Sequence, residues 1–192
     1  MITLSRDWLT EPPSVSVLAA VIQRHRAELP RWQRLRRYFA GRNDKILLRG
    51  EACLPHPIAR YIALLSSGYL TGQPVRYEAE GQEEALREMR ALLSLSASDS
   101  VDSELSLNAA VYGKGVERVY TGPDGLPHIA ALSPEEAFVV YDDTVAHEPL
   151  FGVQLICRQK PDGNPDGVLI EVLTPSACCR FAAPSLTPRS TA

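Results

Sequence analysis

The spacing of apolar residues changes near Gly115, and this change constrains the fold more than any other feature of the sequence. In the stretch 58–69, apolar residues recur at intervals of three and four, which is typical of an amphipathic helix. From residue 116 onward, successive residues alternate between two sides, as they do in a half-buried strand. Helices followed by short strands joined by hairpins predict an α+β protein with an antiparallel sheet.

The first half of the chain predicts a series of helices. Pro30 is expected to separate the first two, because proline breaks a helix interior but is tolerated in a first turn. The helix that starts at Pro57 is expected to be a core helix. The expected helices run from Ser14 or Ser16 to about Leu29, over residues 30–39, from Pro57 to near Gly68 or Gly72, over residues 83–93, and from Asp99 or Ser100 to about Tyr112. The aromatic residues expected in the core are Tyr69, Tyr77, Tyr112, Phe138 and Tyr141.

The second half predicts hairpin-linked strands and then a tail. The expected strands cover residues 115–121, 129–132, 137–141, 150–158 and 167–173. From Thr174 to Ala192 the sequence has three prolines and no strong period, so we expect a loose tail. We therefore expect one domain over residues 1–173, helical over 14–112 and β-rich over 115–173, with a loose C-terminal tail over 174–192.

Charge is unevenly distributed, although the net charge is only −3. Residues 24–49 include nine basic and two acidic residues, whereas the charged residues of the stretch 78–104 are mainly acidic. This arrangement suits a head-to-tail contact between identical copies, and the alternative is two solvated helix faces. The candidate contact residues are Arg31, Arg34, Arg36, Arg37 and Arg42 on the basic side and Glu83, Glu84 and Glu88 on the acidic side. Because the basic stretch lacks a recognisable reading module, we expect no direct DNA binding by it.

Two local motifs could carry chemistry. Asp142, Asp143, His147 and Glu148 could hold a divalent cation, but residues of this kind also satisfy backbone N–H groups in hairpin turns, which is the favoured interpretation. The segment 113–115, Gly-Lys-Gly, lacks the full phosphate-loop motif, so its glycines are expected to end a helix and start a strand. We therefore expect no catalytic residues, no metal, no cofactor and no enzymatic activity.

The hydropathy of the chain and the spacing of its cysteines also argue against a membrane protein and a zinc protein. No apolar run is long enough to span a bilayer, so no membrane association is expected. The four cysteines lack the short Cys-x-x-Cys spacing of zinc sites, and we expect reduced thiols.

Two blocks of the sequence resemble a known family. The segment 59–77 reads Ala-Arg-Tyr-Ile-Ala-Leu-Leu-Ser-Ser-Gly-Tyr-Leu-Thr-Gly-Gln-Pro-Val-Arg-Tyr. The second block runs from 111–120 through 132–145 and contains Pro-x-x-x-Phe-Val-Val-Tyr-Asp-Asp. With Leu35–Gly41, these segments are similar to portal proteins of tailed double-stranded DNA bacteriophages, in the type found in phages with long, non-contractile tails. The resemblance spans roughly residues 31–153.

This resemblance implies a structural subunit of a homo-oligomeric ring at one capsid vertex, through which DNA is packaged and ejected. It implies capsid and scaffolding proteins, the terminase and head-completion proteins as partners, with DNA passing through the ring. The location would be the virion, or the host bacterial cytoplasm if a prophage expresses the chain. Portal subunits of this type are longer, so the chain resembles only the N-terminal wing, without stem, clip and crown. The alternatives are a non-functional remnant of a decayed prophage portal gene and a metal-dependent enzyme around Asp142, Asp143 and His147.

Overall fold

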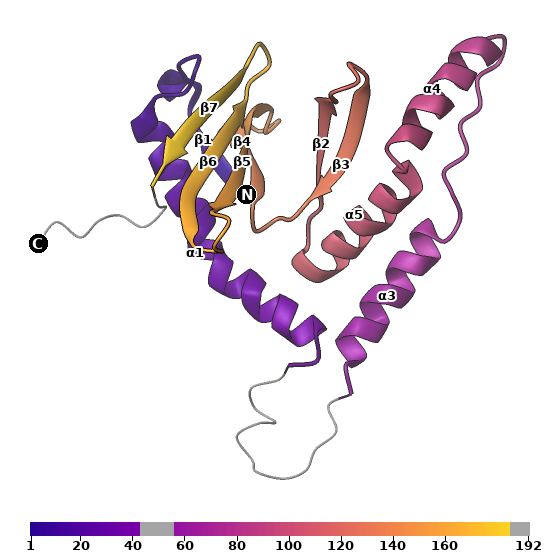
Figure 1. Cartoon of the computed structure of the whole chain (residues 1–192), viewed down its shortest axis with the longest axis horizontal. Helices are drawn as coiled ribbons and strands as arrows, with labels where there is room; N and C mark the ends of the chain where they lie inside the picture. The colour runs from indigo at the N-terminus through magenta and orange to yellow at the C-terminus, as the bar shows by residue number, and fades with distance from the viewer. Residues whose placement is uncertain (43–55, 185–192) are drawn as a thin grey trace, which may run out of the picture. The chain divides into compact units, whose positions relative to one another are not determined.

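The computed structural model describes residues 1–42 and 56–184, which fall into two compact units (Figure 1). The first unit combines Met1–Leu29 with the chain from Glu135 onward, and the second consists of Pro30–Pro134. The boundary passes through helix α1 (Val15–Phe39). Helices dominate before Gly113 and strands after it, which confirms the predicted α+β class.

The first unit is built on a mainly antiparallel sheet. Its described strands follow the order β1-β4-β5-β6-β7, and every neighbouring pair is antiparallel except β1 and β4, which are parallel. The short 3-10 helix η1 (Arg6–Trp8) follows β1. The strand bounds are β1 (Ile2–Leu4), β4 (Ala137–Asp142), β5 (Pro149–Gln159), β6 (Pro165–Leu173) and β7 (Cys178–Ala183).

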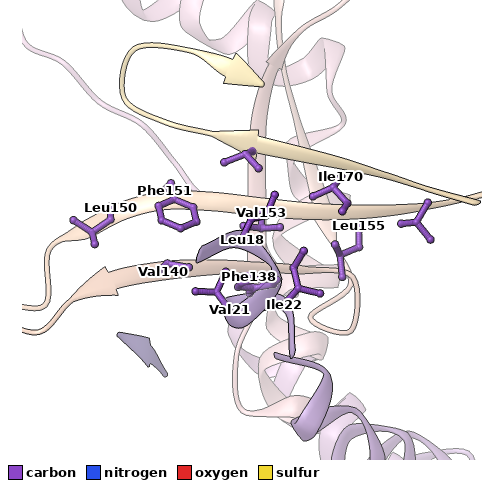
Figure 2. Close-up of a cluster of buried hydrophobic side chains, with 12 residues drawn as sticks. Leu18, Val21, Ile22, Phe138, Val140, Leu150, Phe151, Val153, Leu155 and Ile170 are labelled. Atoms are coloured by element: carbon purple, nitrogen blue, oxygen red, sulfur yellow. The ribbon is translucent and has the colours of Figure 1, made fainter. Parts of the chain in front are cut away.

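The hydrophobic core of the first unit lies on one face of this sheet. Alternate residues of each strand face inward, so that Phe138, Val153 and Val172 form a registered row across three strands. The first half of α1 contributes apolar side chains to the same cluster (Figure 2). The buried members of this core are Leu18, Val21, Ile22, Phe138, Val140, Leu150, Phe151, Val153, Leu155, Val168, Ile170 and Val172.

Both edge strands of this sheet differ from the expectation. Cys178–Ala183, which lie within the tail expected to be loose, form β7, and the inward residues Cys179, Phe181 and Ala183 pack against the core. The alternation in this segment covers only six residues, so it gives a weak strand signal. β1 was not expected either, since three residues are too few for a periodic pattern. Residues 185–192 of the tail lie outside the described residues.

The second unit contains the remaining helices and a separate hairpin. α3 (Ile58–Thr71) packs on α5 (Ser98–Tyr112), while both α4 (Glu83–Leu95) and α5 pack on β3. β2 (Val116–Thr121) and β3 (Pro127–Leu132) pair antiparallel, as predicted, in register from Val116 opposite Leu132 to Thr121 opposite Pro127. This hairpin forms a two-stranded sheet of its own, which corrects the expectation that all the late strands share one sheet.

Helix α1 runs through Pro30 without interruption, so the prediction of two separate helices is wrong. A proline removes one backbone donor and crowds the preceding turn, at a cost of about 3 kcal/mol. His25, before Pro30, and Trp32, after it, are both almost fully buried, and burial on both sides offsets this cost. Ser14 precedes the helix, and its Oγ accepts a hydrogen bond from the Val17 N–H at 3.4 Å.

Helix α3 presents to solvent the side chains that were expected in the core. It buries Ala63 and Ser67 instead, and the Ser67 hydroxyl donates to the Ser103 carbonyl oxygen of α5 at 3.3 Å. Tyr69 is 95% exposed, and Tyr77 is exposed as well. Of the other aromatic residues expected inside, Phe138 is buried, whereas Tyr112 and Tyr141 are half-buried. No helix among the described residues combines the length and the apolar content that a bilayer crossing needs.

Candidate subunit interface

The cluster at the β4–β5 turn is built around a buried carboxylate. Asp142 ends β4, and its side chain is fully buried. Its Oδ2 accepts a hydrogen bond from Arg6 Nε at 3.0 Å, and its Oδ1 accepts hydrogen bonds from the Thr144 hydroxyl at 2.7 Å and the Glu148 N–H at 2.9 Å. The Thr144 hydroxyl, the Arg6 guanidinium and backbone N–H groups lower the pKa of Asp142, although burial opposes them.

The other members of this cluster do not converge on a common point. Asp143 is exposed, and Glu148 forms an ion pair with Arg6. His147 adopts a positive φ of 50°, and its Nδ1 lies 3.4 Å from the Asp142 carbonyl oxygen. No group of three or more His, Cys, Asp or Glu side chains in the described parts of the chain is arranged to hold a metal ion. The arrangement fits the favoured interpretation of a hairpin turn whose carboxylate satisfies local donors.

Arg6 is the residue of this cluster that sequence reasoning missed. Arg6 and Asp142 are 136 positions apart, and no local pattern links them. The parallel pairing of β1 with β4 brings them together, because Leu4 lies opposite Asp142.

The Gly-Lys-Gly segment has a structural role. Gly113 has a left-handed φ of 81°, and its N–H bonds to the Ala109 carbonyl oxygen, so it ends α5 as predicted, and β2 begins shortly after it. The ammonium nitrogen of Lys114 lies 4.1 Å from the centre of the Trp32 ring, which is a cation–π contact. Cys157, Cys178 and Cys179 are free thiols, and Cys53 lies outside the described residues.

The basic candidate residues lie together on the second half of α1 and just beyond it. All of them are exposed, and they are Arg31, Arg34, Arg36, Arg37 and Arg42. Cations at a helix C-terminus interact favourably with the helix dipole. The start of α3 lies beside this end of α1, because Arg60 stacks over the Phe39 ring at 5.8 Å and Pro57 lies against Gly41. The basic cluster is therefore next to the N-terminus of α3.

The acidic candidate residues Glu83, Glu84 and Glu88 lie in the first half of α4 and are exposed. Glu84 pairs with Arg87 at 3.2 Å, but both side chains are more than three-quarters exposed, so this ion pair contributes little to stability. The opposite face of α4, with Leu86, is half-buried. The acids therefore form an outward surface.

An apolar surface lies between these two charged regions in the sequence. We define the α3 stripe as Ile58, Ile62, Leu65 and Tyr69, each of which is more than half exposed. Tyr61 and Leu70 enlarge this exposed surface. Contiguous exposed apolar surface of this kind marks sites of association.

Taken together, the exposed parts of α1, α3 and α4 carry basic, apolar and acidic surfaces, respectively. A comparison with known families gives the class directly, since residues 18–189 match the family described as phage portal protein, SPP1 Gp6-like. The chain belongs to this family, which is structural and non-enzymatic and whose members form oligomeric rings in the virion capsid. The resemblance noted in the sequence is thereby confirmed. A search of curated proteins gave no match.

Proposed function

We propose that this chain is a subunit of the ring at the capsid vertex through which phage DNA is packaged and ejected, and that it acts by packing against copies of itself. The observation that carries this proposal is the pair of oppositely charged, exposed surfaces on α1 and α4 of the second unit. Membership in the portal family supports it.

A closed ring needs a head-to-tail interface, in which two different surfaces of one subunit meet on neighbouring copies. The basic cluster (Arg31, Arg34, Arg36, Arg37 and Arg42) of one copy would face the acidic cluster (Glu83, Glu84 and Glu88) of the next. Complementary potentials of this kind set orientation and register and disfavour wrong pairings. In this arrangement the arginines serve a protein contact and not a DNA contact.

The proposed partners follow from the same role. Capsid and scaffolding proteins would surround the ring, and the terminase and head-completion proteins would dock on it, while DNA passes through the bore. The proposed location is the capsid vertex of the virion, or the host cytoplasm when a prophage expresses the chain.

Charge reversal tests this function. We expect Arg34→Glu with Arg37→Glu, or Glu84→Arg with Glu88→Arg, to weaken self-association by at least about tenfold, as measured by sedimentation velocity. The fourfold variant that carries both reversals should recover association, because each copy then supplies both altered surfaces. Arg158→Glu with Lys160→Glu makes the same change in net charge as the arginine reversal, but at exposed positions of the first unit, and is the matched control for that reversal. A wild-type chain that stays monomeric, or reversals without effect, would overturn the proposal.

A further inference from the structure

Helix α3 has one face of small residues and one face of large apolar residues, and within the described part of the chain it is the small face that packs on another helix. The inner face consists of the small residues Ala59, Ala63, Ser67 and Thr71, and it packs against α5. Small residues allow close approach of the two helices. The larger side chains of the α3 stripe lie on the opposite face, because they follow the positions i, i+4, i+7 and i+11 from Ile58. The side chains that would release most apolar surface from water are thus directed away from the subunit's own core.

Helix α4 has an outward stripe with the same spacing. Glu84, Glu88, Ala91 and Leu95 occupy positions i, i+4, i+7 and i+11, and all four are exposed. Leu95 is 53% exposed although it is a large apolar residue. We define these residues as the α4 stripe. It is acidic near the N-terminus of the helix and apolar near the C-terminus.

We propose that the α3 stripe of one copy packs against the α4 stripe of a neighbouring copy, with the two helices parallel. This inference rests on the proposed ring function and adds the apolar centre of the interface. Each stripe extends about 16 Å along its helix, so the two match in length. Leu65 would lie against Ala91, and Tyr69 against Leu95.

Charge complementarity indicates both which helix packs on the α3 stripe and in which direction that helix runs. The N-terminal end of α3 lies beside the basic cluster of α1, as the stacking of Arg60 on Phe39 shows. A parallel α4 brings Glu84 and Glu88 to this basic end, where the positive end of the α3 dipole also favours carboxylates. An antiparallel α4 would carry the acids to Tyr69, away from the basic cluster. A second copy supplies an exposed helix that is acidic at one end and apolar at the other.

Polar substitutions in the stripe test the apolar contact. Leu65→Asp with Tyr69→Asp should weaken self-association about a hundredfold in sedimentation experiments and leave the circular dichroism spectrum unchanged, because both side chains are exposed in the subunit. Val119→Asp, which adds a carboxylate at an exposed apolar position on β2, is a control outside the stripe and should have little effect.

Cross-linking tests the direction. When a Tyr69→Cys chain is mixed with a Leu95→Cys chain and mildly oxidised, a disulfide between the two chains should form, because a disulfide requires Cα atoms within about 7 Å. Ile58→Cys mixed with Leu95→Cys is the matched pair for the antiparallel arrangement and should not react. Peptide mass mapping distinguishes these bonds from any that involve the natural cysteines.

The outcomes separate this inference from the proposed function. If the Arg34 and Arg37 reversals weaken association but the Leu65 and Tyr69 substitutions do not, the ring proposal stands and the α3–α4 contact is wrong. If neither set has an effect, both fail. A cross-link in the antiparallel pair, or in neither pair, overturns the parallel contact.

Discussion

The Nε of Arg6 donates a hydrogen bond to Oδ2 of the buried Asp142 carboxylate at 3.0 Å, and Nη2 of the same guanidinium forms an ion pair with this oxygen at 2.9 Å. The other oxygen, Oδ1, is taken by Thr144 and by the Glu148 N–H. Both carboxylate oxygens therefore have donors from the protein itself. The parallel ladder between β1 and β4 is only three residues long. The contact between Arg6 and Asp142 therefore also stabilises the position of β1 at the edge of the sheet.

Replacing Asp142 should destabilise the first unit. Asp142→Ala leaves the Thr144 hydroxyl and the Glu148 N–H without their acceptor and removes the partner of Arg6, so we expect the free energy of unfolding to fall by about 3 kcal/mol. Urea unfolding followed by circular dichroism measures this change. Asp143→Ala is the control, and because Asp143 is exposed it should change stability by less than about 0.5 kcal/mol. Equal effects of the two substitutions would contradict the structural role of Asp142.

The same carboxylate predicts a pH dependence of stability. The folded-state pKa of Asp142 lies below its unfolded value of about 3.9, so the unfolded chain binds more protons between these two values. This contribution to stability is fully present above the unfolded pKa and is lost as the pH falls through the folded pKa. The difference in unfolding free energy between wild type and Asp142→Asn should therefore be constant above about pH 5 and shrink as the solution is acidified. A difference that does not change with acidification would exclude this assignment.

The parts of the Asp142 site that the sequence predicted are those that depend on residues close together in the chain. The turn at Asp142 and Asp143 was predictable, because aspartates satisfy backbone donors within a few residues. Arg6 was not, because its approach depends on a parallel pairing between the two distant segments β1 and β4. The exposure of the charged candidates was predictable too, because charged side chains are rarely buried unless they are paired.

The Lys114–Trp32 contact predicts a stability change that can be followed by fluorescence. Lys114→Met removes the ammonium group from the face of a buried indole, and we expect a loss of about 1 kcal/mol. In a Trp8→Phe background, the emission of Trp32 should shift at the same time, because the ammonium group no longer lies over the ring. Lys160→Met, at an exposed position after β5, should change neither property. An unchanged emission spectrum in the Lys114 variant would show that the two side chains do not meet in solution.

Helix α3 shows that the spacing of apolar residues predicts a helix but not which of its faces is buried. The spacing of Ile58, Ile62 and Leu65 correctly predicts a helix, but it also led to the wrong prediction that this face is buried. Periodicity identifies an apolar face and not the surface that covers it. The face that packs on α5 is made of small residues such as Ala63 and Ser67, whose weak apolar signal is masked by the larger stripe. Tertiary packing also explains why the helix α1 continues through Pro30. The burial of Trp32 stabilises a helix that would end at this proline if local propensity alone decided.

Two glycines of the second unit should respond in opposite directions to the same substitution. Gly113 has a φ of 81°, a conformation that costs an L-residue about 1 to 2 kcal/mol, so Gly113→Ala should lower the free energy of unfolding by about that amount. Gly68 lies inside α3, and no neighbouring atom lies within 4 Å of an added Cβ, so Gly68→Ala should raise stability by about 0.5 to 1 kcal/mol. Urea unfolding of both variants measures the two changes, and each variant is the control for the other because both replace glycine with alanine in the same unit. If Gly113→Ala were as stable as wild type, the left-handed end of α5 would be incorrect, and a destabilised Gly68→Ala would show that α3 meets another element on that side.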